Sequence, residues 1–188
     1  MKLYPSCAGT HPSLDAILDL CRREAFGADD VERIDVSVDS VTPTVLIYAQ
    51  PASALEAKFS MPFCAAAAVV YGRVGIDTFD AASLTDPRVT ALMARVHMRI
   101  DPSLDGIGPP LTEARVSIQL RNGRTLTQAA HGARGYPEQP ASDVELGAKF
   151  IACARRTMAE PAAERALALL QQIDRVDDVR TVTALLVT

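Results

Sequence analysis

The hydrophobic positions near the start of the chain follow two different periods. Helical spacing of i, i+3, i+4 and i+7 relates the apolar residues Leu14, Ile17, Leu18 and Cys21. This spacing predicts an amphipathic helix over about 12–26, with a proline in its first turn and a glycine after its end. Apolar and polar residues then alternate strictly in the segment VERIDVSVDS, which predicts a strand with one buried face.

The middle of the chain predicts further short elements. Residues 54–72 are strong helix formers, but Pro62 inside this run should kink or divide the helix. Residues 85–96 carry apolar side chains at helical spacing behind Thr85, a favourable N-cap. The brief alternation over 96–101 predicts a short strand.

The clearest local pattern is that of a β-hairpin over 113–132. Val116, Ile118 and Leu120 alternate with polar residues, as expected of a strand with one buried face. The Asn-Gly pair that follows supplies the positive φ angles of a tight turn. We therefore expect two antiparallel strands joined at this pair.

The order of the predicted elements indicates the fold class. After the hairpin, a capping box at Ser142 and Glu145 begins one helix, Pro161 opens a second, and residues 179–187 predict a third. The order of helix, strand, helices, strand, hairpin and helices contains no repeated βαβ unit. We expect an α+β fold, a two-layer sandwich in which helices pack mainly on one face of an antiparallel sheet of about four strands. No long linker divides the sequence, so one domain over 1–188 is expected.

Composition narrows the functional class. The 188 residues are 48% hydrophobic and 22% charged, which is typical of a globular protein. A net charge of −4, with 5% aromatic residues and no Trp, argues against a nucleic-acid partner. No apolar run approaches the roughly 18 residues of a membrane span, and the first residues do not match a signal peptide. Four cysteines without a CxxC pair predict free thiols in a reducing compartment, the cytoplasm.

The N-terminal segment KLYPSCAGTH concentrates groups that could carry chemistry. Lys2, Cys7 and His11 precede the first predicted helix, and protonatable groups beside helix N–H donors fit a carboxylate-binding corner. His11 has the side chain best suited to move protons near neutral pH. In the alternative interpretation, Lys2 is a solvated terminal charge and His11 is a helix cap or surface group. The spacing leaves both interpretations open.

Cys7 also has two interpretations. It could be a nucleophile with His11 as its base, because a helix N-terminus favours the thiolate. Alternatively, it is a small, semi-buried hydrophobic residue. No third and fourth ligand stand at a usual metal spacing from these two residues, so no metal is expected. The chain has no glycine-rich phosphate loop, and no cofactor is expected.

Three later residues are candidates for substrate binding. Arg134 lies in HGARGYPEQP, a loop punctuated by Gly and Pro, and could bind a substrate carboxylate with its planar guanidinium. It could equally be a solvated surface charge. Ser60 and Phe63 in KFSMPF could line a pocket where the helix is kinked, although Phe63 is as readily explained by core packing beside Pro62.

Four blocks of sequence together carry a resemblance to a known protein family. They are KLYPSCAGTHPSLDA, EAKFSMPFCAAAAVVYGRVGIDTF, DPRVTALMARV and ARGYPEQPASDVELGAKF. Together, in this order, they resemble the C-terminal domain of the MmgE/PrpD family over nearly all of the chain from Lys2 onward. That family includes 2-methylcitrate dehydratases, cis-aconitate decarboxylases and iminodisuccinate-processing enzymes.

This resemblance implies a lyase. Family members abstract a proton next to a carboxylate of a small di- or tricarboxylic acid and then release water or carbon dioxide. The resemblance implies that Lys2 binds a substrate carboxylate and that His11 is a nearby acid, base or polar partner. In some relatives a His corresponds to Cys7 and a Tyr to Phe63, so the chain departs from them at both positions.

The resemblance also implies a missing partner. Family members place the active site between a helical N-terminal domain and an α+β domain, and the chain resembles only the second. We therefore expect it to be inactive alone and to associate as a homodimer or with a chain that carries the helical domain. Alternatives are an epimerase or isomerase half, or a non-catalytic module that binds a ligand or mediates oligomerisation.

Overall fold

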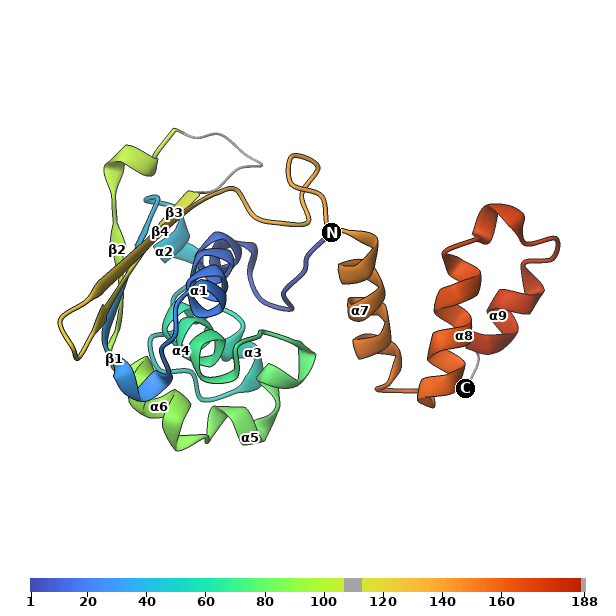
Figure 1. Cartoon of the computed structure of the whole chain (residues 1–188), viewed down its shortest axis with the longest axis horizontal. Helices are drawn as coiled ribbons and strands as arrows, with labels where there is room; N and C mark the ends of the chain where they lie inside the picture. Colours follow the sequence, from blue (N-terminus) through green and yellow to red (C-terminus); the bar gives the residue numbers. More distant parts are fainter. Residues whose placement is uncertain (107–112, 187–188) are drawn as a thin grey trace. The chain divides into compact units, whose positions relative to one another are not determined.

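The computed structural model describes residues 1–106 and 113–186 and divides the chain into two compact units (Figure 1). Unit 1 is Met1–Pro140, which contains a four-stranded sheet and the helices that cover it. Unit 2 is Ala141–Thr188, in which the described regular structure is helical. The single domain expected over 1–188 stays a prediction.

The sheet of unit 1 has the strand order β2-β1-β3-β4. Its strands are β1 (Val31–Val38), β2 (Val96–Ile100), β3 (Glu113–Leu120) and β4 (Thr125–His131). β3 pairs antiparallel with β1 and with β4, whereas β2 pairs parallel with β1. The α+β fold is confirmed, but the expectation of a wholly antiparallel sheet is wrong. The chain between β1 and β2 passes through helices, and such a crossover returns the next strand in the parallel direction.

Helices cover one face of this sheet. Those of unit 1 are α1 (His11–Arg23), α2 (Thr42–Val45), α3 (Ala54–Ala57), α4 (Met61–Tyr71), α5 (Ala81–Leu84) and α6 (Pro87–Met93). α1 contacts β3 and β4, α4 contacts β2, and the two helices contact each other (Figure 1). Leu14 and Ile17 of α1 and Ile34 of β1 are fully buried in the resulting core. The helix and the first strand predicted from the sequence are therefore confirmed.

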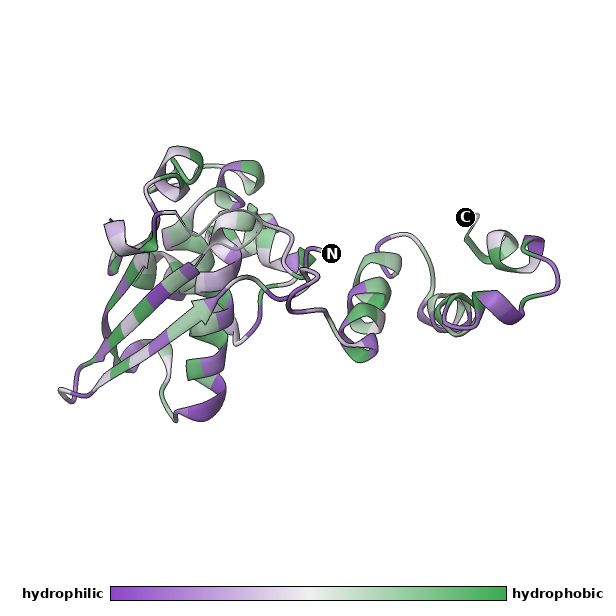
Figure 2. Ribbon diagram, turned by 90° about the horizontal axis from the view of Figure 1, so that it is seen from above, coloured by the Kyte–Doolittle hydropathy of each residue, from purple (hydrophilic) through white to green (hydrophobic). Residues whose placement is uncertain are grey.

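The opposite face of the sheet is polar, and Figure 2 shows hydrophobic and hydrophilic residues alternating along the strands. On this face Asp35 of β1 accepts hydrogen bonds of 2.7 and 2.8 Å from Arg33 and lies 3.0 Å from Arg99 of β2. The hydrogen bonds from Arg33 hold the pKa of Asp35 below its ordinary value. A solvated face of this kind is usual where antiparallel pairing dominates a sheet.

Local chemistry sets the helix boundaries. Pro62 divides the helical run into α3 and α4, as predicted, and the Ser60 hydroxyl caps the second of these helices. α6 is capped by Asp86, whose Oδ1 accepts from the Arg88 backbone N–H at 2.9 Å. The expectation of Thr85 as the cap is wrong by one residue, because the Thr85 hydroxyl donates back to carbonyl groups of α5.

The β3–β4 hairpin forms where the sequence predicts it. Its turn places Gly123 at a φ of 86°, in the left-handed region that favours glycine. The Gly123 N–H donates to the Leu120 carbonyl at 2.9 Å and closes the turn. The alternating pattern points Val116 and Ile118 into the core, where both are buried.

Unit 2 contains α7 (Asp143–Ala154), α8 (Glu160–Leu170) and α9 (Arg180–Leu186), and α8 contacts both of the others. The predicted capping box is present, because the Glu145 N–H donates to the Ser142 hydroxyl at 3.3 Å and the Ser142 N–H donates to the Glu145 carboxylate at 3.0 Å. Among the described residues of the whole chain, no helix is both long and apolar enough to cross a membrane.

Candidate functional site

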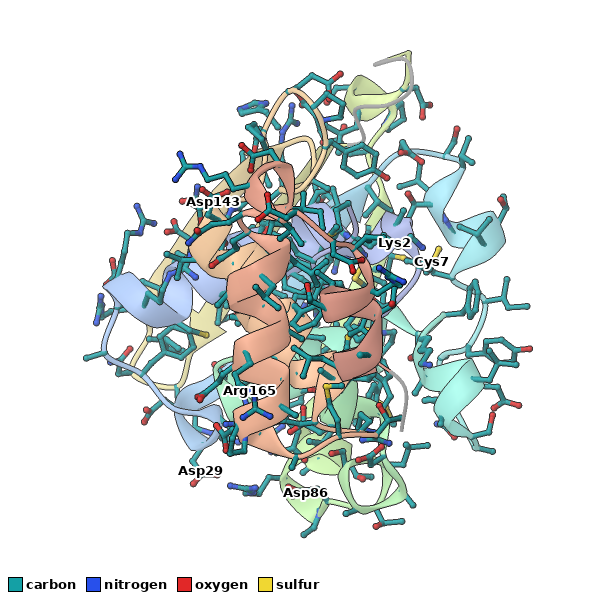
Figure 3. All side chains as sticks on the ribbon, turned by 90° about the vertical axis from the view of Figure 1, so that its right-hand side faces the viewer. Lys2, Cys7, Asp29, Asp86, Asp143 and Arg165 are labelled. Atoms are coloured by element: carbon teal, nitrogen blue, oxygen red, sulfur yellow. The ribbon has the colours of Figure 1, made fainter. Side chains whose placement is uncertain are left out.

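The candidate site lies where the N-terminal segment meets the start of α1. Lys2 is exposed, and its Nζ donates to the Ser6 carbonyl oxygen at 3.3 Å. The Nε2 atom of His11 lies 3.4 Å from the same oxygen. Cys7 follows Ser6 directly, and Figure 3 shows it near Lys2. The structure thus brings Lys2, Cys7 and His11 together around one peptide group.

His11 lies beneath this corner rather than on its surface. It is 0% exposed, and its ring meets the Tyr4 ring edge to face, with the ring centroids 5.2 Å apart. Because a carbonyl oxygen only accepts hydrogen bonds, the Nε2 atom that faces Ser6 carries a hydrogen. A buried imidazole behind an exposed ammonium group suits the polar partner of Lys2 that the sequence predicts.

Cys7 is half-buried, and its backbone is fixed on both sides. Its N–H donates to the Lys58 carbonyl at 2.9 Å. Its carbonyl accepts from the Thr10 N–H at 3.0 Å and from the Thr10 hydroxyl at 2.8 Å. Burial raises the pKa of the neighbouring Cys64 thiol, and Cys7 adds to this rise. A nucleophilic role for Cys7 stays a prediction.

Arg134 lies in a loop that runs beside the N-terminal segment. The terminal ammonium of Met1 donates to the Gly135 carbonyl. Gly135 has a φ of 91°, and a Cβ atom there would collide with the Met1 carbonyl oxygen and lie 3.3 Å from Leu3 Cγ. Only glycine fits so close an approach. The fold therefore brings Arg134 and Lys2, which are far apart in sequence, into neighbouring segments.

Asp15 of α1 joins these two segments and is not among the residues predicted from the sequence. Its Oδ1 accepts from the Tyr4 hydroxyl at 2.6 Å, and its Oδ2 accepts from the Arg134 backbone N–H at 2.9 Å. A signal exists in the helical spacing, since Asp15 stands four residues after His11 and three before Leu18. A carboxylate on this buried face of a helix needs hydrogen-bond partners.

The surroundings of Asp15 shift two pKa values. Burial raises the pKa of Asp15 above its ordinary value of 3.8, and the hydrogen bonds from Arg134 and Tyr4 oppose this only in part. Burial, with the nearby Asp15 charge, also raises the pKa of the Tyr4 hydroxyl. The pair therefore holds its protons more tightly than the free side chains do.

This shift predicts a pH dependence of stability. A carboxyl group with a higher pKa in the folded state favours folding when protonated, so its contribution falls as the pH rises from about 4 through the folded pKa. Asp15→Asn removes this titration. In urea denaturation, we expect the free energy of unfolding of the variant, relative to that of the wild type, to increase as the pH is raised. Parallel stability curves would contradict the prediction.

Ser60 and Phe63 lie in the core of unit 1. The Ser60 hydroxyl, 0% exposed, accepts from the Phe63 N–H at 3.2 Å. Phe63 is 1% exposed and packs against Phe79 with the ring centroids 5.8 Å apart. These contacts make Ser60 a helix cap and Phe63 a core residue, and a part for either in substrate binding stays a prediction.

A hollow of about 280 Å³ is lined in part by Asp15 and Asp19 of α1. Arg134 lines it, together with Arg22 and His131, and Arg22 pairs with Asp19 at 3.7 Å.

Within residues 1–106 and 113–186, no group of three or more His, Cys, Asp and Glu side chains could hold a metal ion. The ammonium of Lys2 and the guanidinium of Arg134 are cations of the kind that bind carboxylates.

Comparison with known proteins identifies the family. Residues 4–183 match the family described as the MmgE/PrpD C-terminal domain. The chain is 25% identical over 194 residues to cis-aconitate decarboxylase of Mus musculus, an alignment that covers 98% of the chain and 38% of that relative. It is 23% identical over 191 residues to cis-aconitate decarboxylase of Homo sapiens, with 98% and 39% covered.

A third relative is the cis-aconitate decarboxylase-like protein oryM of Aspergillus oryzae, 23% identical over 158 residues, with 80% of the chain and 32% of the relative covered. The chain therefore spans less than two fifths of the length of these relatives. The family match covers the first of the four blocks from Tyr4 onward and the other three in full, and the resemblance is confirmed. Lys2 lies two residues before the matched region. The chain belongs to the MmgE/PrpD family and matches its C-terminal domain.

Proposed function

We propose that this chain is the substrate-binding half of a lyase that acts on small di- or tricarboxylic acids. The observation that carries the proposal is the family match over residues 4–183, together with relatives named cis-aconitate decarboxylase. The exposed ammonium of Lys2, backed by His11 at the Ser6 carbonyl, supports it with a group suited to a carboxylate.

The chemistry assigned to the corner is electrostatic. Removal of a proton next to a carboxylate, or loss of carbon dioxide, places negative charge on the substrate. An ammonium group held beside that charge lowers the barrier, because its attraction is stronger in the transition state than in the ground state. Lys2 takes this role, His11 is its polar partner, and Arg134 binds a second carboxylate of the substrate.

The other half of the proposed site belongs to a partner. The relatives are more than twice as long as the region they share with this chain. Lys2 is exposed, so water has access to the corner in the chain alone, and a covering domain would strengthen the charge interactions there. We propose a helical domain, in the same protein or on another chain, as this partner. Pairing of two copies of this chain in a homodimer is the alternative association. The four free cysteines are in keeping with a reducing compartment such as the cytoplasm.

Reconstitution tests this function. We expect the chain alone to give no measurable turnover of citrate-like acids. Supplying a helical N-terminal domain of the family, in the same polypeptide or as a separate one, should give alkene formation or carbon dioxide release. A complex that is no faster than either chain alone would contradict the proposal. Deuterium uptake from heavy water without elimination would show an epimerase instead.

A further inference from the structure

One carboxylate connects three separate parts of unit 1. Asp15 lies on α1, Tyr4 on the N-terminal segment and Arg134 on the loop after β4. The Tyr4 hydroxyl donates to one oxygen of Asp15 at 2.6 Å, and the Arg134 backbone N–H donates to the other at 2.9 Å. Each carboxylate oxygen therefore holds a different segment against the same helix.

The two segments that Asp15 holds also touch each other. Met1 donates to the Gly135 carbonyl, and Leu3 packs where a side chain at Gly135 would otherwise lie. The Tyr4 ring, anchored by its hydroxyl, forms the contact with buried His11. A displacement of the N-terminal segment would therefore also shift the loop that carries Arg134, and the reverse.

Burial increases the free-energy cost of losing the two hydrogen bonds that Asp15 accepts. Tyr4 is 8% exposed, and Asp15 is half-buried on the face of α1 that turns inward. A buried hydroxyl or carboxylate that loses its partner carries the full desolvation penalty, whereas an exposed one binds water instead. Asp19, one turn further along α1, shows the contrast, because within the described residues its carboxylate pairs with the exposed side chains of Arg22 and Arg23.

We propose that Asp15 is a positioning residue, which fixes the spacing between the Lys2 ammonium and the Arg134 segment by binding Tyr4 with one oxygen and the Arg134 backbone with the other. The inference rests on the proposed function, because it assigns these two cations to one polycarboxylate. Asp15 itself does not touch the substrate. Its effect is to keep the distance between two cationic segments matched to a substrate that carries more than one carboxylate.

The test uses the full chain and four variants. Asp15→Ala removes both bonds. Asp15→Asn retains one oxygen for the Arg134 N–H, and its amide group donates to the Tyr4 oxygen, so it is the conservative rescue. Tyr4→Phe removes only the hydroxyl bond, and Asp19→Ala is the matched control on the same helix.

Nuclear magnetic resonance reads the positioning without any ligand. In Asp15→Ala we expect amide exchange at Arg134 to accelerate about tenfold or more, and the order parameters of residues 2–6 to fall toward the flexible range. Exchange in β1 and α4 should stay as in the wild type. Asp15→Asn and Asp19→Ala should resemble the wild type, and Tyr4→Phe should loosen residues 2–6 alone. If Asp15→Ala does not fold, Tyr4→Phe still tests whether the hydrogen bond to Asp15 orders residues 2–6.

Calorimetry with cis-aconitate as the probe reads the consequence for binding. We expect Asp15→Ala to weaken the affinity about tenfold and Asp15→Asn to restore it to within about twofold of the wild type. Unchanged exchange at Arg134 and unchanged order in residues 2–6 of the Asp15→Ala chain would overturn the inference. Accelerated exchange in a protein whose wild type binds no cis-aconitate would support the positioning role and would count against the proposed function instead.

Discussion

Replacing Lys2 with Ala in the reconstituted complex is expected to lower kcat/KM for a tricarboxylic acid by about 100- to 1,000-fold. Lys2 is the exposed cation of the corner, and its Nζ is held 3.3 Å from the Ser6 carbonyl. Its loss leaves the charge that develops on the substrate without a counter-charge. Steady-state kinetics over a range of substrate concentrations would separate the loss in kcat from the rise in KM.

Two further lysine variants separate a specific role of Lys2 from an effect of the net charge of the protein. Lys149→Ala removes a positive charge from α7 in unit 2, and we expect its rate to stay within about twofold of the wild type. Lys2→Arg keeps the charge but changes its shape and reach, so we expect an intermediate loss, mainly in kcat. Equal effects of Lys2→Ala and Lys149→Ala would mean that Lys2 acts only through the net charge of the protein.

The largest expected effect on stability is that of Phe63→Ala. Phe63 is 1% exposed, packs against Phe79 and stands in the first turn of α4, where its N–H bonds to the Ser60 cap. Truncation leaves a cavity in a core that has few aromatic residues, and the expected loss is about 3–5 kcal/mol in the free energy of unfolding. Urea denaturation of the chain, followed by circular dichroism, measures it.

Phe63→Leu is the matched control, because it retains most of the buried volume. We expect it to lose less than about 1.5 kcal/mol. A loss below about 1 kcal/mol for Phe63→Ala would show that the side chain is not held in a packed core. It would favour the interpretation that Phe63 lines a pocket.

The elements that the sequence predicts well are those with local causes. Leu14 and Ile17 share one face of a helix through their spacing alone, and Gly123 specifies its turn through its own backbone freedom. The direction of β2 has no local cause. Its residues 96–100 pair with β1 in parallel because of the crossover through α2 to α6, which no short pattern contains.

The same distinction applies to the candidate site. Lys2 and His11 are close in sequence, so their meeting at the Ser6 carbonyl could be anticipated from the segment itself. The bond from Arg134 to Asp15 joins residues 119 positions apart, and only the folded chain shows it. The sequence also suggests Ser60 as a pocket residue, whereas the hydroxyl of a Ser before a proline-containing helix start serves equally well as a cap.

The most direct measurement is a crystal structure of the reconstituted complex with a bound, unreactive tricarboxylate. We predict a carboxylate oxygen at a charge-assisted hydrogen-bond distance of about 2.7–2.9 Å from Lys2 Nζ, with His11 still at the Ser6 carbonyl behind it. A ligand bound with every carboxylate held by other residues, and with the Lys2 ammonium in open solvent, would contradict the proposed site.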